Sequence, residues 1–381
     1  MRALIAATFV ALAAHGATSA VRNVTIVDPA SGEARSRQTV VIRGDRIVAS
    51  GPAASTRIPK AARILDGSRK YAIPGLWDMH VHLWDRENVL PEYVAYGVTG
   101  VRDMGSDFRR VSRWRAEIER GRAIGPRIVT CGPAVNGVPS NEPKLPIDVV
   151  STPEQARREY DRLDEMHVDF VKVLSKLPRE AYFALAERAR HWGLPFAGHI
   201  PEEVTAEEAI DSRIASIEHW FNFPLKDEGR SRAALEKCAM FGTSVTPTLT
   251  LWRRMVQDGS TGADSLPLVD AAVRRAREAG VAILAGTDTG DPGTKPGLEL
   301  HKELELLVGA GLTPAQALRT ATTEPARFLH REQARPADLV LLDANPLEDI
   351  RNTRKIAGVF VRGRYVPKAR LATLARPPVR K

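Results

Sequence analysis

The chain has 381 residues, of which 43% are hydrophobic and 27% are charged, with 28 glycines and 26 prolines. This length is enough for a large buried core. The composition is that of an ordinary globular protein, so it excludes a mainly disordered, collagen-like or coiled-coil chain. No apolar run after the N-terminus approaches the roughly 20 residues of a membrane-spanning helix.

The formal net charge is +9, from 55 basic and 46 acidic residues. The basic residues are mixed with acidic ones and show no basic run with interleaved aromatics. We therefore interpret the charge as a solvated surface, with no nucleic-acid partner. The two cysteines, Cys131 and Cys238, are too few for a disulfide framework or a four-thiolate metal site. One disulfide between them is an alternative to two buried free thiols, which we prefer.

Residues 1–20 resemble a secretory signal peptide. Arg2 supplies a short positive region, residues 3–14 are apolar, and the small residues 18–20 precede a cleavage site after Ala20. The sequence therefore predicts an exported protein, periplasmic or extracellular, with no stable membrane association after cleavage. An uncleaved N-terminal anchor is the alternative.

Short alternating strand patterns occur near both ends of the mature chain. Residues 21–73 contain a hairpin signal at Gly44-Asp45, and residues 337–367 contain one at Arg362-Gly363. We expect these two segments to combine into one small β-sandwich domain. Residues 368–381 are interpreted as a basic, mobile tail.

Residues 74–336 alternate between strand and helix patterns. Helical patterns lie at residues 178–191, 203–212, 268–279 and 298–310. Eight apolar strand candidates lie at residues 76–82, 98–104, 127–132, 169–174, 194–199, 215–219, 244–249 and 282–288. The fold class is therefore α/β, and eight such units in this length fit a (β/α)8 TIM barrel.

Residues able to bind metals lie in or at the ends of five of these strands. They are His80, His82, Lys172, His199, His219 and Asp288. The first two form an H-x-H pair, whose side chains point to the same side of a strand. Imidazole is the commonest metal ligand, and the active sites of such barrels lie at the carboxyl ends of the strands. We therefore expect one metal site there.

These segments resemble the metal-dependent amidohydrolase superfamily, in particular its imidazolonepropionase-like and Xaa-Pro-dipeptidase-like branch. The resemblance covers nearly all of residues 21–366. It rests on the motifs GLWDMHVHLWD, YGVTGVRDMG, DFVKVLS, PFAGHIP, SIEHW, ILAGTDTG and ADLVLLDANPLEDI. It implies a distorted TIM barrel with a β-sandwich made from both chain ends, which agrees with the strand pattern.

The resemblance also implies how two divalent ions would be held. In the two-metal members, the H-x-H pair and the strand-eight aspartate hold one ion, which assigns His80, His82 and Asp288 to it. The histidines of strands five and six, here His199 and His219, hold the other. Zinc is the expected metal, because it suits a histidine-rich set of nitrogen and oxygen ligands.

Lys172 is expected to be carboxylated by CO2 and to bridge both ions. A carbamate offers two oxygens and a negative charge, whereas an ammonium group cannot bind a cation. Its formation needs a neutral amine, which burial favours by lowering the lysine pKa. A site with one metal, in which Lys172 has only a structural role, is the alternative.

The implied activity is that of a metal-dependent hydrolase acting on carbon–nitrogen bonds. Two ions activate water as hydroxide, which attacks a carbonyl, and Asp288, the expected catalytic residue, passes the proton to the leaving amine. We expect a small substrate, either a dipeptide or an N-acyl amino acid. The alternatives are a mononuclear hydrolase of cyclic amides or lactones and, remotely, a metal-binding protein without turnover. A homo-oligomer remains open.

Arg102 and His301 are weaker candidates, for substrate binding. Arg102 ends the second strand, where it could bind a substrate carboxylate, although a structural ion pair is the preferred interpretation. His301 follows the strand-eight loop and could line the site or lie on a helix surface. Residues 133–150 read as a long loop that could set specificity.

Overall fold

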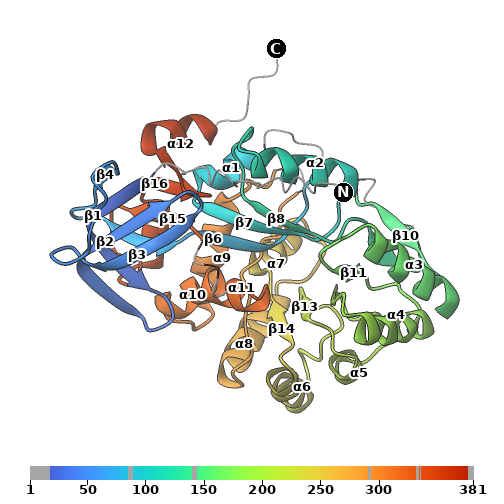
Figure 1. Cartoon of the computed structure of the whole chain (residues 1–381). Coiled ribbons are helices and arrows are strands. Elements are labelled where there is room, and N and C mark those ends of the chain that lie inside the picture. Colours follow the sequence, from blue (N-terminus) through green and yellow to red (C-terminus); the bar gives the residue numbers. More distant parts are fainter. Residues whose placement is uncertain are drawn as a thin grey trace, which may run out of the picture.

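The structure is a computed structural model that describes residues 18–84, 89–139, 144–290, 293–331, 334 and 336–375 (Figure 1). Short parallel strands carry the predicted site. They are β6 (Leu76–Val81), β7 (Val98–Asp103), β8 (Arg127–Thr130), β9 (Ala134–Asn136), β10 (Ile147–Val149), β11 (Val171–Val173), β12 (Phe196–Gly198), β13 (Ser216–Glu218) and β14 (Ser244–Thr246). They form two parallel sheets, in the orders β6-β7-β8 and β10-β9-β11-β12-β13-β14.

The predicted eighth strand is an extended segment that connects these two sheets. Ile283 pairs with Val245 of β14, and Thr289 pairs with Val81 of β6, both in parallel. At the other side of the two sheets, the amide of Asp169, just before β11, donates to the carbonyl at the end of β8 at 2.9 Å. All eight predicted strand positions are therefore occupied by paired backbone, in the predicted order.

Helices alternate with these strands and lie outside them (Figure 1). They are α1 (Val89–Ala95), α2 (Phe108–Glu119), α3 (Pro153–Glu165), α4 (Arg179–Trp192), α5 (Ala206–Asp211), α6 (Glu228–Phe241), α7 (Leu249–Gln257), α8 (Ser265–Glu278), α9 (Leu298–Gly309), α10 (Pro314–Thr320) and α11 (Thr323–Phe328). The four predicted helices correspond to α4, α5, α8 and α9. Threonine capping boxes at Thr152, Thr205 and Thr313 fix the starts of α3, α5 and α10 by satisfying free backbone amides.

Both chain ends meet in one eight-stranded mixed sheet. Its strands are β1 (Thr18–Asp28), β2 (Glu33–Arg43), β3 (Arg46–Pro52), β4 (Arg63–Asp66), β5 (Tyr71–Pro74), β15 (Leu339–Leu342), β16 (Ile356–Val361) and β17 (Arg364–Pro367). Their order is β17-β16-β15-β5-β1-β2-β3, with β4 also paired to β1. The two ends therefore combine as expected, but the described strands are hydrogen-bonded into a single sheet and not into the two sheets of a sandwich.

The two predicted hairpin turns lie against each other in this sheet. Gly44-Asp45 joins β2 to β3, and Arg362-Gly363 joins β16 to β17. Both residues of the second turn have positive φ angles, of 49° and 72°, as a two-residue hairpin with a primed turn requires. A Cβ atom on Gly363 would lie 1.7 Å from the carbonyl oxygen of Gly44, so only glycine fits there.

Two segments differ from the prediction. Residues 368–374 of the predicted mobile tail form helix α12 (Lys368–Leu374), which packs on α1 and β16 and buries Leu371. The rest of that tail, residues 376–381, lies outside the described residues. Residues 133–150 are not one long loop, because they contain β9 and β10; residues 140–143 are outside the described part. A 3-10 helix, Ile350–Arg354, precedes β16.

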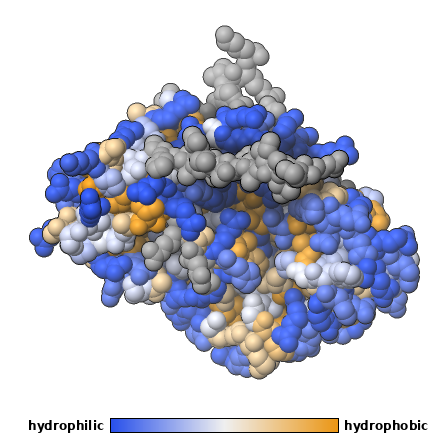
Figure 2. Space-filling model, in the orientation of Figure 1, coloured by the Kyte–Doolittle hydropathy of each residue, from blue (hydrophilic) through white to orange (hydrophobic). Residues whose placement is uncertain are grey.

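Other expectations concern the surface and the thiols. The face shown in Figure 2 is mainly hydrophilic, with small scattered hydrophobic groups, which agrees with a solvated charged surface. Cys131 and Cys238 are both buried and free, as we preferred. Among the described residues, no helix is both long enough and apolar enough to cross a membrane.

The N-terminal strand begins before the predicted start of the mature chain. Residues 18–20 pair with residues 41–43 of β2, and Ser19 and Ala20 also pair with β4. Ala20 is completely buried. Cleavage after Ala20 would therefore remove residues that are paired on both edges of β1. Residues 1–17 of the predicted signal peptide lie outside the described residues.

We expect a chain that starts at Val21 to be less stable than one that starts at Thr18. Each lost backbone hydrogen bond costs about 1 kcal/mol, so the free energy of unfolding should fall by about 2–4 kcal/mol. Urea unfolding of the two purified chains measures this difference. Equal unfolding midpoints would show that residues 18–20 do not contribute to the folded sheet.

Candidate metal centre

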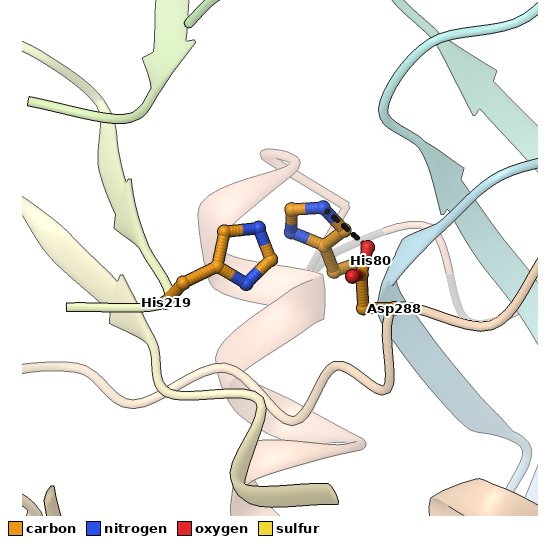
Figure 3. A group of neighbouring side chains, drawn as sticks. All are labelled: His80, His219 and Asp288. Atoms are coloured by element: carbon orange, nitrogen blue, oxygen red, sulfur yellow. Dashed lines mark ion pairs between the residues drawn. The ribbon is translucent and has the colours of Figure 1, made fainter. Parts of the chain in front are cut away.

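The six predicted metal-site residues come together at the carboxyl ends of the parallel strands. The ring centroids of His80 and His219 are 4.3 Å apart, and those of His199 and His219 are 5.1 Å apart. Figure 3 shows His80 and His219 on opposite sides of one space, with the Asp288 carboxylate beside His80. The elements β6, β11, β12, β13 and the extended segment 283–289 supply these side chains.

Asp288 joins the two members of the H-x-H pair. Its Oδ1 atom lies 3.3 Å from His80 Nε2 and 3.2 Å from His82 Nε2. One donor atom from each of His80, His219 and Asp288 lies within 4.8 Å of the other two. Two ligands of one zinc ion, each about 2.1 Å from it, are at most about 4.2 Å apart. The spacing of Asp288 and the H-x-H pair is therefore suited to one ion.

The Nδ1 atoms of the H-x-H pair are held by acceptors. His80 Nδ1 lies 2.7 Å from Glu218 Oε2, and His82 Nδ1 lies 3.1 Å from the carbonyl oxygen of Gly105. A carbonyl or an ionised carboxylate can only accept a hydrogen bond, so both Nδ1 atoms carry the proton. In the neutral ring, each Nε2 atom therefore presents a lone pair, the form that binds a metal.

The other two histidines are fixed in a similar way. His219 Nδ1 lies 2.8 Å from the hydroxyl oxygen of Thr248, and that hydroxyl donates its own proton to the carbonyl of Pro247. His219 Nδ1 must therefore be the donor, which leaves its Nε2 atom as an acceptor. His199 Nδ1 lies 2.8 Å from Ser175 Oγ. The protein thus orients all four rings through their Nδ1 atoms.

The backbone at the site is strained. His219, Trp220, Thr248 and Asp288 have φ angles of 62°, 65°, 48° and 55°, in the left-handed region that non-glycine residues avoid. Each such residue costs on the order of 1 kcal/mol or more. Strain of this kind persists only where the surrounding structure fixes it, and here it directs His219 and Asp288 to the site.

Burial and charge set the protonation of the ligands. Burial, with Lys172 and His219 nearby, holds the pKa of His199 well below its usual value, and burial beside His80 does the same for His219. Both rings are therefore neutral near pH 7. Burial alone would raise the pKa of Asp288, but the neighbouring imidazoles of His80, His82 and His219 outweigh it and hold that pKa well below its usual value. Asp288 is thus an anion.

Lys172 is buried in the same region, with 1% of its surface exposed. Burial lowers the pKa of Lys172 to about 8, although the charges of Glu218 and Asp288 partly oppose this shift. No carboxylate of the described residues lies within ion-pair distance of its ammonium. About a tenth of this amine is therefore neutral at pH 7, far more than for an exposed lysine.

These groups have the properties of a cation site. His80 Nε2 and Asp288 Oδ1 are buried and lack a hydrogen-bond partner. In the neutral rings, with Nδ1 protonated, the Nε2 lone pairs of His80 and His82 both face the anionic oxygen of Asp288. Three acceptors that face one another without a proton repel each other, and a divalent ion between them removes this repulsion. The residues present therefore fit the metal that the motifs imply.

Arg102 forms the structural ion pair that we preferred for it from the sequence. Only 1% of it is exposed, and its guanidinium donates to Glu218 Oε1 at 2.7 Å, to Ser216 Oγ at 2.8 Å and to the Met79 carbonyl at 2.6 Å. All three nitrogens are engaged inside the ring of strands. The structure thus favours the structural ion pair over contact with a substrate.

Glu218, the partner of Arg102, is a positioning residue that sequence reasoning missed. Burial alone would raise the pKa of Glu218, but Arg102 and His80 outweigh it and hold that pKa well below its usual value. The sequence did not indicate Glu218 because adjacent residues of a strand point to opposite sides. Glu218 precedes His219, so we expected its side chain to point away from the metal site. The positive φ of His219 turns its ring back to the side of Glu218.

His301 also lies away from the site. It is completely buried in α9, where its Nε2 donates to the Tyr96 carbonyl at 2.9 Å and its Nδ1 lies 2.9 Å from Thr353 Oγ1. Burial lowers the pKa of His301 to about 4, so the ring is neutral. Both nitrogens are used in packing α9 on neighbouring segments, and the expected role in substrate binding is not supported.

Asp103, next to Arg102 at the end of the second strand, is a second positioning residue. This buried carboxylate at the end of β7 accepts from the amide of Leu83 at 3.0 Å, from Ser106 Oγ at 2.6 Å and from Thr130 Oγ1 at 2.7 Å. Leu83 directly follows His82. Asp103 therefore fixes the chain as it leaves the H-x-H pair.

Comparison with known proteins agrees with this site. The sequence matches the amidohydrolase family over residues 71–366. Ochratoxinase of Aspergillus niger is 22% identical over 396 aligned positions, which cover 85% of this chain and 81% of that protein. An adenine deaminase of Rubrobacter xylanophilus is 23% identical over 366 positions, 90% of this chain; the chain spans only 56% of that relative's length.

A protein of Bifidobacterium longum, described as a proposed prolidase, has a similar solved structure. It superimposes with a TM-score of 0.80 at 27% identity, over 94% of this chain and 98% of that chain. The chain thus belongs to the amidohydrolase family, as its motifs indicated. It is a hydrolase that acts on carbon–nitrogen bonds.

We expect Glu218→Gln to weaken metal binding. The amide cannot match the charge of Arg102, and it can turn its NH2 group toward His80 Nδ1, so the ring loses its fixed orientation. Changes to groups that orient metal ligands typically cost 10–100-fold in affinity, and we expect a loss of about this size. Titration of chelator-treated protein with zinc measures it, with Glu236→Gln on the exposed face of α6 as the control. Unchanged zinc affinity in Glu218→Gln would refute the positioning role.

Proposed function

We propose that the protein is a binuclear metal-dependent amidohydrolase that cleaves an amide or peptide bond in a dipeptide or an N-acyl amino acid. The observation that carries this proposal is the geometry at Asp288. Its Oδ1 atom lies 3.2–3.3 Å from the Nε2 atoms of His80 and His82, and neither this oxygen nor His80 Nε2 has a hydrogen-bond partner among the described residues. Such a set of acceptors is built for a cation at the place where a hydrolase of this family acts.

The ligand sets are those that the resemblance to the two-metal members of the superfamily implies. His80, His82 and Asp288 would hold one ion, and His199 and His219 the other. Histidine-rich nitrogen and oxygen ligands favour zinc. When bound, two such ions polarise the substrate carbonyl and lower the pKa of water so that it can attack near neutral pH.

Lys172, as its carbamate, would lie between the two ligand sets. The lowered pKa supports this role, because CO2 reacts only with the neutral amine. The carbamate would replace a buried cation with a buried anion, and two cations nearby would stabilise that anion. The absence of an ion-pair partner for Lys172 among the described residues fits a group that functions in another charge state.

Asp288 would transfer the proton during hydrolysis. Its carboxylate is anionic, and 16% of it remains exposed, so water and substrate can reach it. It would accept the proton of the attacking water and deliver it to the nitrogen of the leaving amine.

The fold and the location belong to the same proposal. The parallel strands and their connecting segment would form a (β/α)8 barrel, whose carboxyl ends carry the site. The apolar residues 3–14 support export, because they precede the folded sheet and follow a basic residue.

We expect purified protein to hydrolyse N-acyl amino acids or dipeptides, and a chelator to abolish this activity. Asp288→Asn should lower kcat/KM by about 100-fold or more, because general acid–base catalysis contributes about that much. The measurement is ninhydrin detection of released amine over a panel of substrates, with Asp211→Asn on the surface of α5 as the control. Chelator-resistant hydrolysis, or full activity of Asp288→Asn, would contradict the proposal.

A further inference from the structure

A positive charge lies against the backbone of the proposed catalytic aspartate. Arg254, on α7, donates from Nη1 to the carbonyl of Thr287 at 3.3 Å and from Nη2 to the carbonyl of Asp288 at 3.0 Å. Its side chain is only partly buried. The guanidinium is thus held at the residue whose carboxylate faces the H-x-H pair.

The start of α7 is fixed firmly. Both carboxylate oxygens of Glu303 accept from the first amides of the helix, those of Leu249 and Thr250, each at 2.8 Å. The indole of Trp252 donates to the His219 carbonyl at 2.8 Å. The helix that carries Arg254 is therefore attached to the backbone of two proposed metal ligands.

No carboxylate of the described residues forms an ion pair with Arg254, although the charge of Asp258 at the end of α7 acts on it from a longer distance. A guanidinium has five N–H groups, and two of them reach backbone carbonyls, so three remain for a ligand. Its neighbour Arg253 has a carboxylate partner, because Arg253 Nη2 donates to both carboxylate oxygens of Asp270, at 2.7 and 2.9 Å. Arginine binds carboxylates strongly through paired N–H groups.

Two aromatic side chains flank the metal ligands. Trp84 lies over His82 with ring centroids 4.9 Å apart, and its indole is fixed by the Gly105 carbonyl at 3.0 Å. The ring centroid of Phe221 lies 4.9 Å from that of His219 and 5.2 Å from that of His199. Both rings are partly exposed, so each offers an apolar surface to a bound molecule.

We propose that Arg254 binds a carboxylate of the substrate, and that Trp84 and Phe221 contact an apolar side chain next to the cleaved bond. The inference rests on the proposed function and narrows it to amides of apolar amino acids that carry a free carboxylate. Trp84 and Phe221 would favour an aromatic or large aliphatic residue.

The test compares N-acetyl-L-phenylalanine with its primary amide, N-acetyl-L-phenylalaninamide. We expect wild-type protein to prefer the acid by about 10–100-fold in kcat/KM, the size of a lost hydrogen bond to a charged group. Arg254→Gln should remove this preference by slowing hydrolysis of the acid, whereas Arg254→Lys should retain part of it. Arg253→Gln is the matched control and should keep the full preference.

Two results would overturn the role of Arg254. One is a wild-type protein that does not distinguish the acid from the amide. The other is an Arg254→Gln variant with unchanged metal content that loses activity equally on both compounds, because Arg254 would then only position Asp288.

The proposed function can fail separately. If the wild type cleaves neither compound, calorimetry on the zinc-loaded protein still tests the Arg254 site. Tighter binding of the acid than of the amide, lost in Arg254→Gln, would support the carboxylate site without the proposed hydrolysis. Equal binding, or none, would overturn it.

The aromatic contacts have their own comparison, between N-acetyl-L-phenylalanine and N-acetyl-L-alanine. Wild-type protein should prefer the phenylalanine compound, and Phe221→Ala should reduce that preference about fivefold or more, since burial of apolar area is lost. A preference that Phe221→Ala leaves unchanged would overturn the contact with Phe221.

Discussion

The buried ion pair between Arg102 and Glu218 is the interaction on which the site depends. It connects β7 to β13, and Arg102 also donates to the Met79 carbonyl on β6. The other oxygen of Glu218 accepts from His80, so one carboxylate links the strand framework to a proposed metal ligand. Removing one partner of a buried pair typically costs 3–5 kcal/mol, because a charge is left without compensation.

The ion pair between Arg102 and Glu218 also explains how positive and negative side chains can be buried together at the metal site. Glu218 separates the cation of Arg102 from the imidazole of His80 and stays ionised between them. Asp288 and Lys172 lie beyond it, one anionic and one with a lowered pKa. Without bound cations, the lone pairs at Asp288 are an unfavourable arrangement that the fold must hold in place.

Backbone strain adds to this picture. The left-handed conformations of His219, Thr248 and Asp288 are costly, and the neighbouring hydrogen bonds are what maintain them. Arg254 contributes through the Asp288 carbonyl, and Trp252 through that of His219. A site held in this way has its ligands aligned before any ion or substrate arrives, so little is spent on ordering them.

Much of this architecture could be predicted from the sequence. The eight strand positions, four helices and both hairpin turns carry local patterns, and the six metal-site residues stand at recurring places on those strands. The roles of Glu218 and Arg254 could not be predicted in the same way. Glu218 depends on one positive φ angle that breaks strand alternation, and Arg254 depends on where α7 turns after β14. Helix α12 could not be predicted either, because it is stabilised by packing on α1, which lies far away along the chain.

The measurement that tests the account most directly is the metal content per chain, by elemental analysis of protein purified without chelator. It should be made on wild-type protein, on Lys172→Ala and on Lys355→Ala as a surface control. The account predicts about two divalent ions in the wild type and in the control, and a clear loss in Lys172→Ala. About one ion in all three proteins would contradict the carbamate-bridged site and make Lys172 a structural residue of a mononuclear hydrolase.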